Sequence, residues 1–415
     1  MQSRMNSQKN RFSKFNLMQM SGKVLTASSG IKVRIYVAVC ATMFMLLSTY
    51  IGDYMPHHFG NDELTMKQLH LVELAIGKSK HNVPDNILPV NIGYDRQLTD
   101  FFDEYGIPCG VIDVTDRNKL LEFLTKIRES QYAAIALDVF FDGDITADGD
   151  SALFACINEM PRLVVPIHSD KCINQAIHFD KFANGDYMIN MTSGNFTKYK
   201  FGGEDEIPSI AARLYRFADE DSVYFNYDLT DATIILPLSI GINTSYMEDG
   251  TKVWYNLGSD LLDIYSDQEL SNLVKGKTIV IGDYCINDQH DSYIGSISGP
   301  GIIINALHAL RMEKTKRNIL SVIITSLVYI LLAGGLIFNV SISRFFHLKQ
   351  RPFLNFLLSF VGYGFLLWLL QALQFSLFSE FHDTLFVTLF LSLYSIYCQK
   401  LNEKYPFQYS NKVTN

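Results

Sequence analysis

Four apolar segments, one near the start of the chain and three in close succession near its end, constrain the fold most. They run from 35 to 51, from 319 to 340, from 353 to 375 and from 381 to 398. Apolar stretches of roughly 17–25 residues are long enough to cross the hydrocarbon core of a bilayer as helices. The sequence therefore predicts four transmembrane helices in a lipid bilayer, with one long polar segment, residues 52–318, between the first helix and the second.

Two other interpretations of these segments are weaker. A cleaved signal peptide would need a small-x-small site after the first segment, and Tyr50 to Tyr54 provide none. Burial inside a large soluble protein would not explain why the loops between the segments alternate in charge. The first segment is therefore predicted to be an uncleaved signal anchor.

Basic residues set the predicted topology, because short cytoplasmic loops are enriched in Lys and Arg. Residues 1–34 contain seven Lys and Arg and no acidic residue, and the loop after the second segment carries Arg344, Lys349 and Arg351. The loop of residues 376–383 is acidic and contains no Lys or Arg. We therefore expect a basic cytoplasmic tail (1–34), an exported domain (52–318) and a short cytoplasmic tail (399–415).

The excess negative charge of the chain lies in the predicted exported segment. Residues 52–318 contain 22 Lys and Arg against 40 Asp and Glu, a formal charge of −18, whereas the whole chain carries −8. Binding to nucleic acid requires Lys and Arg that neutralise phosphates. This composition excludes nucleic acid as a partner and suits a cationic ligand or a basic partner.

Short β-rich runs alternate with helical patterns in the exported segment. The helical patterns begin near Thr115 and near Asp150, where each has a plausible N-cap residue. Continuous apolar runs of this length suit strands that are buried on both faces of a parallel sheet. The predicted strands are Ile87–Ile92, Cys109–Val114, Tyr132–Asp138, Leu163–Ile167 and Lys277–Gly282. The predicted fold class is α/β, a doubly wound and mostly parallel sheet in the exported domain, together with the four transmembrane helices.

Several motifs in this segment resemble one known family. They are Asp113-Val-Thr-Asp116-Arg117, Ala134-Ile-Ala-Leu-Asp138-Val-Phe-Phe, Asp148-Gly-Asp150, and Lys277-Thr-Ile-Val-Ile-Gly282-Asp283 followed by Asp288, His290 and Gly299-Pro300-Gly301. The segment of roughly residues 85–315 resembles the CHASE domain of the second type, an extracytoplasmic sensory module associated with bacterial cyclases and histidine kinases. One membrane helix before the domain and three after it match the layout of that family.

The resemblance implies a receptor input domain outside the bacterial cytoplasmic membrane, in the periplasm or beyond. Only residues 399–415 follow the last apolar segment, and no cyclase or kinase sequence lies among them. We therefore expect an unidentified cytoplasmic or membrane protein to supply the output. A homo-oligomer is a further expectation that the sequence leaves open.

The candidate ligand-binding residues lie where predicted strands end. Asp113, Asp138 and Asp283 each end a strand, and ligands bind at the carboxyl edge of open α/β sheets. Asp116 and Arg117, which carry the resemblance, join them as candidates. His290 stands between two aspartates, where a neutral imidazole could ligate a metal or titrate with pH, or could form an ordinary hydrogen bond to Asp.

An Asp-rich loop is a candidate site for a divalent cation such as calcium. Its oxygen-bearing side chains recur at alternate positions, as hard cations require. They are Asp142, Asp144, Thr146, Asp148 and Asp150. The loop departs from the EF-hand pattern at Ala147, where glycine is expected, and at Leu153, where a bidentate Glu is expected. A solvated loop that caps a helix is the alternative interpretation.

Three functions remain open at this stage. The first is a sensory membrane protein whose exported domain recognises a ligand or partner. The second is a structural scaffold of an envelope complex. The third, a metal-assisted hydrolase, lacks support, because the chain contains no GxSxG, HExxH or GxxxxGK[ST] motif. We expect the protein not to be an enzyme.

Overall fold

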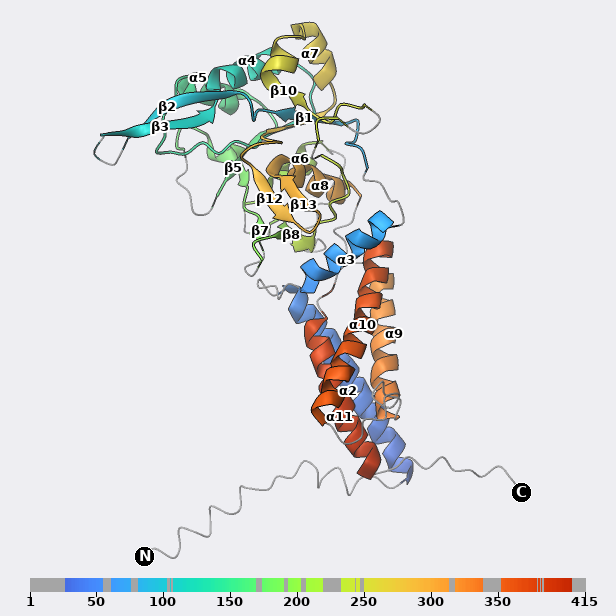
Figure 1. The fold of residues 1–415 in the computed structure, drawn as a ribbon. Helices are drawn as coiled ribbons and strands as arrows, with labels where there is room; N and C mark the ends of the chain where they lie inside the picture. Colours follow the sequence, from blue (N-terminus) through green and yellow to red (C-terminus); the bar gives the residue numbers. More distant parts are fainter. Residues whose placement is uncertain are drawn as a thin grey trace, which may run out of the picture. The chain divides into compact units, whose positions relative to one another are not determined.

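The computed structural model describes residues 27–54, 61–75, 81–102, 105, 107–168, 174–189, 193–202, 207–218, 233–242, 244–246, 250–312, 318–338, 352–378, 380, 382 and 384–404. The chain divides into two compact units (Figure 1). One is an α/β unit that begins with helix α3 (Asn61–Ala75) and continues to helix α8 (Gly299–Arg311). The other is a helical unit.

A six-stranded, entirely parallel sheet forms the centre of the α/β unit. Its strand order is β10-β1-β11-β4-β5-β6. The strands are β10 (Tyr255–Asn256), β1 (Ile87–Asn91), β11 (Thr278–Gly282), β4 (Ala134–Leu137), β5 (Leu163–Ile167) and β6 (Phe182–Asn184). The central strands are buried on both faces, as their continuous apolar sequences require.

Alternate residues of the strands pack into two separate cores, one on each face of the sheet. Ile279 and Ile281 face helices α4 (Arg117–Ile127), α5 (Asp150–Glu159) and α7 (Asp267–Val274). Val280 faces α6 (Ile210–Ala218) and α8. Helices therefore cover both faces, and the prediction of an α/β fold built on a parallel sheet is confirmed.

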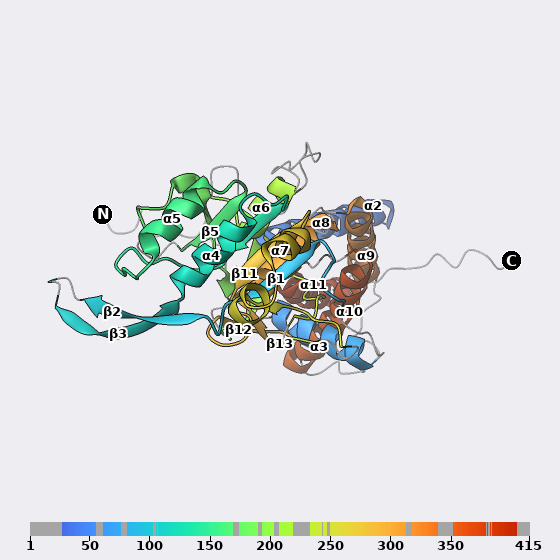
Figure 2. The ribbon, with the colours of Figure 1, turned by 90° about the horizontal axis from the view of Figure 1, so that it is seen from above.

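Four of the five predicted strands lie in this sheet as β1, β4, β5 and β11. Cys109–Val114 is also a strand, as predicted, but its expected place in the parallel sheet is wrong. That segment belongs to β3 (Pro108–Thr115), which pairs antiparallel with β2 (Arg96–Phe102) in a separate two-stranded sheet. The two strands form an arm that extends from the unit (Figure 2), and most side chains of β3 are exposed. A short apolar run specifies extended backbone but does not specify its partner, so the sequence could not distinguish this arm from a central strand.

The first residues of helices α4 and α5 have clear local causes in the sequence. Asp116, rather than Thr115, caps α4, because its carboxylate accepts the amides of Asn118 and Lys119. Gly149 precedes α5 with a φ of 92°, a left-handed conformation that glycine adopts without strain. Asp150 consequently lies in the first turn of α5, where a negative charge is favourable.

A second, mixed sheet lies beside α8 and supplies one wall of the site. Strands β12 (Gln289–Ser292) and β13 (Gly295–Ser298) form a hairpin, and β12 pairs with β8 (Phe196–Lys200). The remaining strands of this sheet, β7 (Met188–Ile189) and β9 (Thr233–Ile235), both pair with β8. Ser298 ends β13 and caps α8 by accepting the amide of Gly301.

The helical unit is a bundle of α2 (Ala27–Tyr54), α9 (Ile319–Ile337), α10 (Pro352–Phe378) and α11 (Leu385–Lys404). By length and composition, three segments among the described residues could cross a membrane: Ile31–Ile51, Ile319–Ile337 and Phe356–Phe378. The prediction of four such helices is therefore supported for three. The fourth, α11, carries more polar residues, although it packs against α2 and α9.

Candidate functional site

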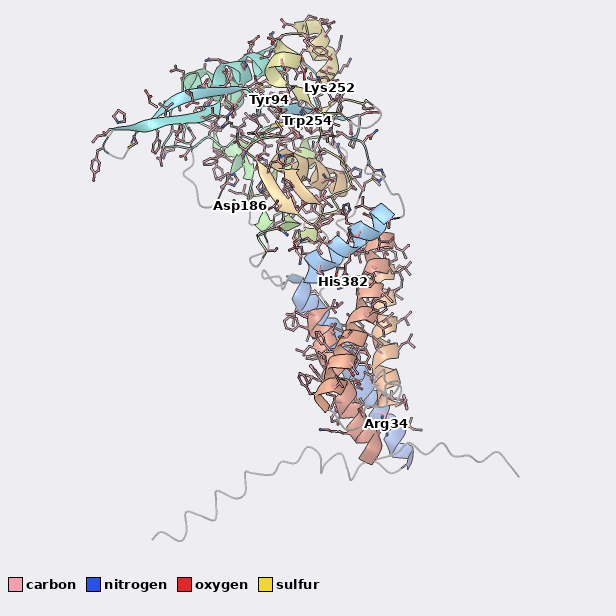
Figure 3. The ribbon with its side chains drawn as sticks, in the orientation of Figure 1. Arg34, Tyr94, Asp186, Lys252, Trp254 and His382 are labelled. Atoms are coloured by element: carbon pink, nitrogen blue, oxygen red, sulfur yellow. The ribbon has the colours of Figure 1, made fainter. Side chains whose placement is uncertain are left out.

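A cavity of about 960 Å³ opens at the carboxyl edge of the parallel sheet. Residues at the ends of strands line it. Asp138, His168 and Asp283 directly follow β4, β5 and β11, and Asp186 lies two residues after the end of β6. The parallel strands all run toward this edge, so residues far apart in the sequence meet there. Asp186 is labelled in Figure 3. The expectation that Asp138 and Asp283 converge is confirmed, since β4 and β11 are neighbours.

Asp138 is the most perturbed carboxyl group of the site. Its Oδ2 atom is buried and has no hydrogen-bond partner among the described residues. Burial and then the negative charge of Asp288 raise the pKa of Asp138 well above its usual range. Both effects favour the protonated carboxyl over the carboxylate.

Asp283 has a different role, because its own loop satisfies it. Oδ1 accepts the amides of Cys285 at 3.0 Å and Ile286 at 2.8 Å, and Oδ2 accepts the amide of Asn287 at 3.0 Å. A side chain at Gly93 would come within 2.6 Å of Oδ1, so the backbone there must approach closely. Asp283 therefore fixes the loop that leads to Asp288.

Two histidine–aspartate pairs stand on the cavity wall. His290 Nε2 lies 2.9 Å from Asp288 Oδ1, and His168 Nδ1 lies 3.0 Å from Asp186 Oδ1. Each imidazole also meets an aromatic ring: Tyr187 beside His290 at 4.8 Å and Phe140 beside His168 at 5.3 Å between centroids. Burial and then the charges of Asp138 and Asp288 raise the pKa of the Tyr187 hydroxyl well above its usual range, so it stays neutral.

Arg117 reaches the wall from the start of α4. Its Nε donates to Asp150 Oδ1 at 2.9 Å, and both side chains are buried. Its guanidinium carbon lies 4.7 Å from the centroid of the Phe141 ring, a cation–π contact. Burial lowers the pKa of Arg117, and the charge of Asp150 opposes that effect. The pair joins α4 to α5.

Of the two remaining predicted ligand-binding residues, one lies on the cavity wall and the other caps helix α4. Asp113 lines the cavity from β3 and forms an ion pair with Arg96 Nε at 3.0 Å. Asp116 caps α4 and is not among the lining residues. The structure thus brings Asp113, Arg117, Asp138, Asp283 and His290 to one cavity, and their role in binding remains a prediction.

The Asp-rich loop does not form an evident cation site. Asp142 lines the cavity and accepts the amide of Asp144 at 3.0 Å, whereas Asp150 is engaged by Arg117. The backbone carbonyl of Asp148 accepts Gln97 Nε2. In the part of the chain that the structure describes, no group of three or more His, Cys, Asp and Glu side chains is placed to hold a metal ion. The calcium prediction gains no support from the geometry.

Sequence reasoning missed His168, Asp186, Tyr187 and Phe140. His168 follows the predicted strand Leu163–Ile167 directly, so the rule that selected Asp138 would have found it. β6 has only three residues, too few for a recognisable pattern, and this hid Asp186 and Tyr187.

The described residues thus combine three helices that could cross a membrane with an α/β domain that carries a cavity at the carboxyl edge of its parallel sheet. The model of the CHASE2 domain, an extracytoplasmic sensory domain, matches residues 102–340, more than half of the chain. The chain therefore belongs to the CHASE2 domain family. No curated protein and no solved structure matches it.

Proposed function

We propose that this chain is a sensory protein of the bacterial cytoplasmic membrane. Its extracytoplasmic domain recognises a ligand or partner at the cavity, and its helices relay the change to a separate protein. The observation that carries the proposal is the position of the cavity at the carboxyl edge of a parallel sheet in a CHASE2 domain. Ligands of open α/β sheets bind at this edge.

We propose further that α11 is a fourth membrane helix and that both termini are cytoplasmic. Thr388, Ser392 and Ser395 are buried, and Thr388 and Ser392 donate to backbone carbonyls one turn earlier. Polar side chains that face a bundle and have partners are tolerated in a membrane. These inward hydroxyls lower the hydropathy of α11 without exposing polar groups to lipid.

The proposed relay has a physical connection at one end of the bundle. Arg34 on α2 is buried, donates to Asn402 Oδ1 of α11 at 2.6 Å, and also donates to the carbonyl oxygen of Ile337 on α9. The candidate span Ile31–Ile51 includes Arg34, which the sequence prediction placed at the end of the cytoplasmic tail, and ionisable residues inside membrane bundles are costly and usually functional. One arginine thus links three helices, so a movement of one helix is transmitted to the other two.

The protein is proposed not to be an enzyme, so its output requires a partner. Affinity purification of the full chain in mild detergent tests this, with wild type compared with Asp288→Asn. We expect recovery of a cytoplasmic or membrane protein with an output domain, in amounts or activity that the substitution changes. Repeated recovery of no partner would contradict sensing. A partner whose recovery and activity ignore the substitution would indicate a scaffold.

A further inference from the structure

The charges on the cavity wall do not balance. Six carboxyl groups and four basic side chains line it. Each base already has an acidic partner: Arg96 with Asp113, Arg117 with Asp150, His168 with Asp186, and His290 with Asp288. No base on the wall therefore lacks a counter-charge.

Three wall carboxyl groups have no such partner. Asp138, Asp142 and Asp283 form no ion pair with a basic side chain within the described residues. Asp283 is satisfied by backbone amides of its loop. Among the described residues, the Asp142 carboxylate accepts one amide and Asp138 Oδ2 accepts no hydrogen bond. The wall thus has unused acceptor capacity, and its carboxyl groups outnumber its basic side chains.

Other ligand classes fit this wall poorly. An anion would have to compete with an aspartate for each base and would meet a wall whose carboxyl groups outnumber its bases, and like charges repel. A bare metal ion is disfavoured, because no group of three or more His, Cys, Asp and Glu side chains in the described ranges could hold one. The volume of about 960 Å³ instead matches pockets for organic molecules, typically about 300–1,000 Å³.

We propose that the cavity binds a small organic cation with ammonium N–H donors, a class that includes aliphatic diamines and polyamines. The proposal deepens the sensory function proposed above and rests on it. Asp142 and Asp138 accept the ammonium groups, and the rings of Phe140 and Tyr187 provide the aromatic surface that organic cations favour.

The buried carboxyl gives this binding a proton signature. A nearby positive charge stabilises the ionised form of a carboxyl group, so an ammonium group that docks beside Asp138 displaces its proton. Binding of the cation therefore releases a proton, and affinity rises with pH until Asp138 is ionised in the free protein.

Calorimetric titration of the full chain in detergent tests the proposal. The cationic probes are 1,4-diaminobutane, spermidine and choline, and choline lacks N–H donors. The matched probes with the same four-carbon chain are 1,4-butanediol and succinate, and calcium chloride tests a metal. We expect saturable binding of the two amines at least about tenfold tighter than that of every other probe, a difference of about 1.4 kcal/mol.

Substitutions of Asp142 and Asp138 test whether these carboxyl groups bind the amine. Asp142→Asn keeps the Oδ1 acceptor for the amide of Asp144 and removes the charge, so it should weaken diamine binding about tenfold or more without unfolding the loop. Asp138→Asn should abolish the proton release measured in buffers of different ionisation enthalpy. Asp100→Asn, an exposed carboxyl on β2, is the matched control and should change neither quantity.

The outcomes separate this inference from the proposed function. Binding of succinate, butanediol or calcium in place of the amines overturns the ligand class, while sensing still stands or falls by the partner experiment. Binding of no amine, or amine binding that both Asp138→Asn and Asp142→Asn leave unchanged, also overturns it.

Discussion

Some side chains at the cavity lie in energetically unfavourable surroundings, and Asp138 is the clearest case. Its Oδ2 is buried and unpartnered within the described residues, and the charge of Asp288 adds to the penalty of ionisation. Burial of a carboxylate without a partner is unfavourable, so the group keeps its proton in the fold at pH values where an unfolded chain has lost it. Groups with such perturbed pKa values are found most often at functional sites.

Asp138→Asn should therefore stabilise the free protein at neutral pH. A raised carboxyl pKa means that the folded state binds the proton more tightly, so wild type loses stability as pH rises from about 4 to the folded pKa. The variant does not titrate there. Its advantage should be small near pH 4, should grow with pH, and should appear as a higher Tm, about 2–4 °C for each kcal/mol.

Thermal unfolding of the full chain in detergent at several pH values measures this difference, and Asp100→Asn is the control for loss of an exposed carboxyl. A variant less stable than wild type throughout the range would show that Asp138 is ionised and favourably solvated in the fold.

Substitution within the buried ion pair Arg117–Asp150 should instead lower the stability of the protein. Asp150→Ala leaves a buried guanidinium without a counter-charge and should cost about 3–5 kcal/mol. Glu159→Ala removes a partner of Arg128 at 2.8 Å, but that pair is 44% and 58% exposed, so the loss should be below about 1 kcal/mol. Denaturant unfolding compares the two, and equal effects would contradict a structural role for the buried pair.

At the scale of elements, sequence reasoning worked where burial determines the pattern. β5 and β11 were predictable because both faces of these strands are covered, which gives an uninterrupted apolar run. β3 has the same kind of run, but within the described residues it pairs only with β2, because tertiary context rather than strand propensity decides the neighbour of a strand. The site residues differ in the same way. Asp138 and Asp283 follow strands that the sequence pattern reveals, so they could be predicted, while Asp186 follows β6, which is too short to recognise.

Substitutions should distinguish the arm from the sheet. Leu98 on β2 is 75% exposed, so Leu98→Ser should change the free energy of unfolding by less than about 0.5 kcal/mol. Ile279 on β11 is fully buried, and Ile279→Ala should cost about 2–5 kcal/mol through lost burial and a cavity. Denaturant unfolding measures both. A large loss in Leu98→Ser would mean that the arm is covered in the protein as it exists in solution.

At the scale of the whole molecule, the helical unit must hold together as one bundle if it is to relay a change. The hydroxyl of Thr49 on α2 lies 2.8 Å from that of Tyr329 on α9, and Arg34 links α2 to α9 and α11 nearer the start of α2. Polar contacts of this kind specify how helices pair where apolar surfaces alone do not discriminate.

Arg34→Ala should therefore loosen the bundle. Loss of its charge-assisted hydrogen bonds to Asn402 and to the carbonyl of Ile337 should lower the stability of the detergent-solubilised chain by about 1.5–3 kcal/mol. Lys32, on the same helix and exposed, provides the control, and Lys32→Ala should change stability by less than about 0.5 kcal/mol. Thermal unfolding compares them. A neutral Arg34→Ala would remove this residue from the proposed relay.

The proposed orientation in the membrane can be tested with the cysteines of the chain. Cys109 on β3 is exposed, whereas Cys156 in α5 is buried, and burial raises the pKa of the Cys156 thiol and so depletes its reactive thiolate. In spheroplasts of an expressing bacterial host, a variant that retains only Cys109 should react with a membrane-impermeant maleimide. A variant that retains only Cys156 should react only after denaturation.

A single cysteine introduced by Ser7→Cys should react only after the membrane is permeabilised, because positive segments remain inside. Labelling of the Ser7→Cys variant in intact spheroplasts, together with no labelling of the Cys109 variant, would mean that the domain faces the cytoplasm and cannot sense an external cation.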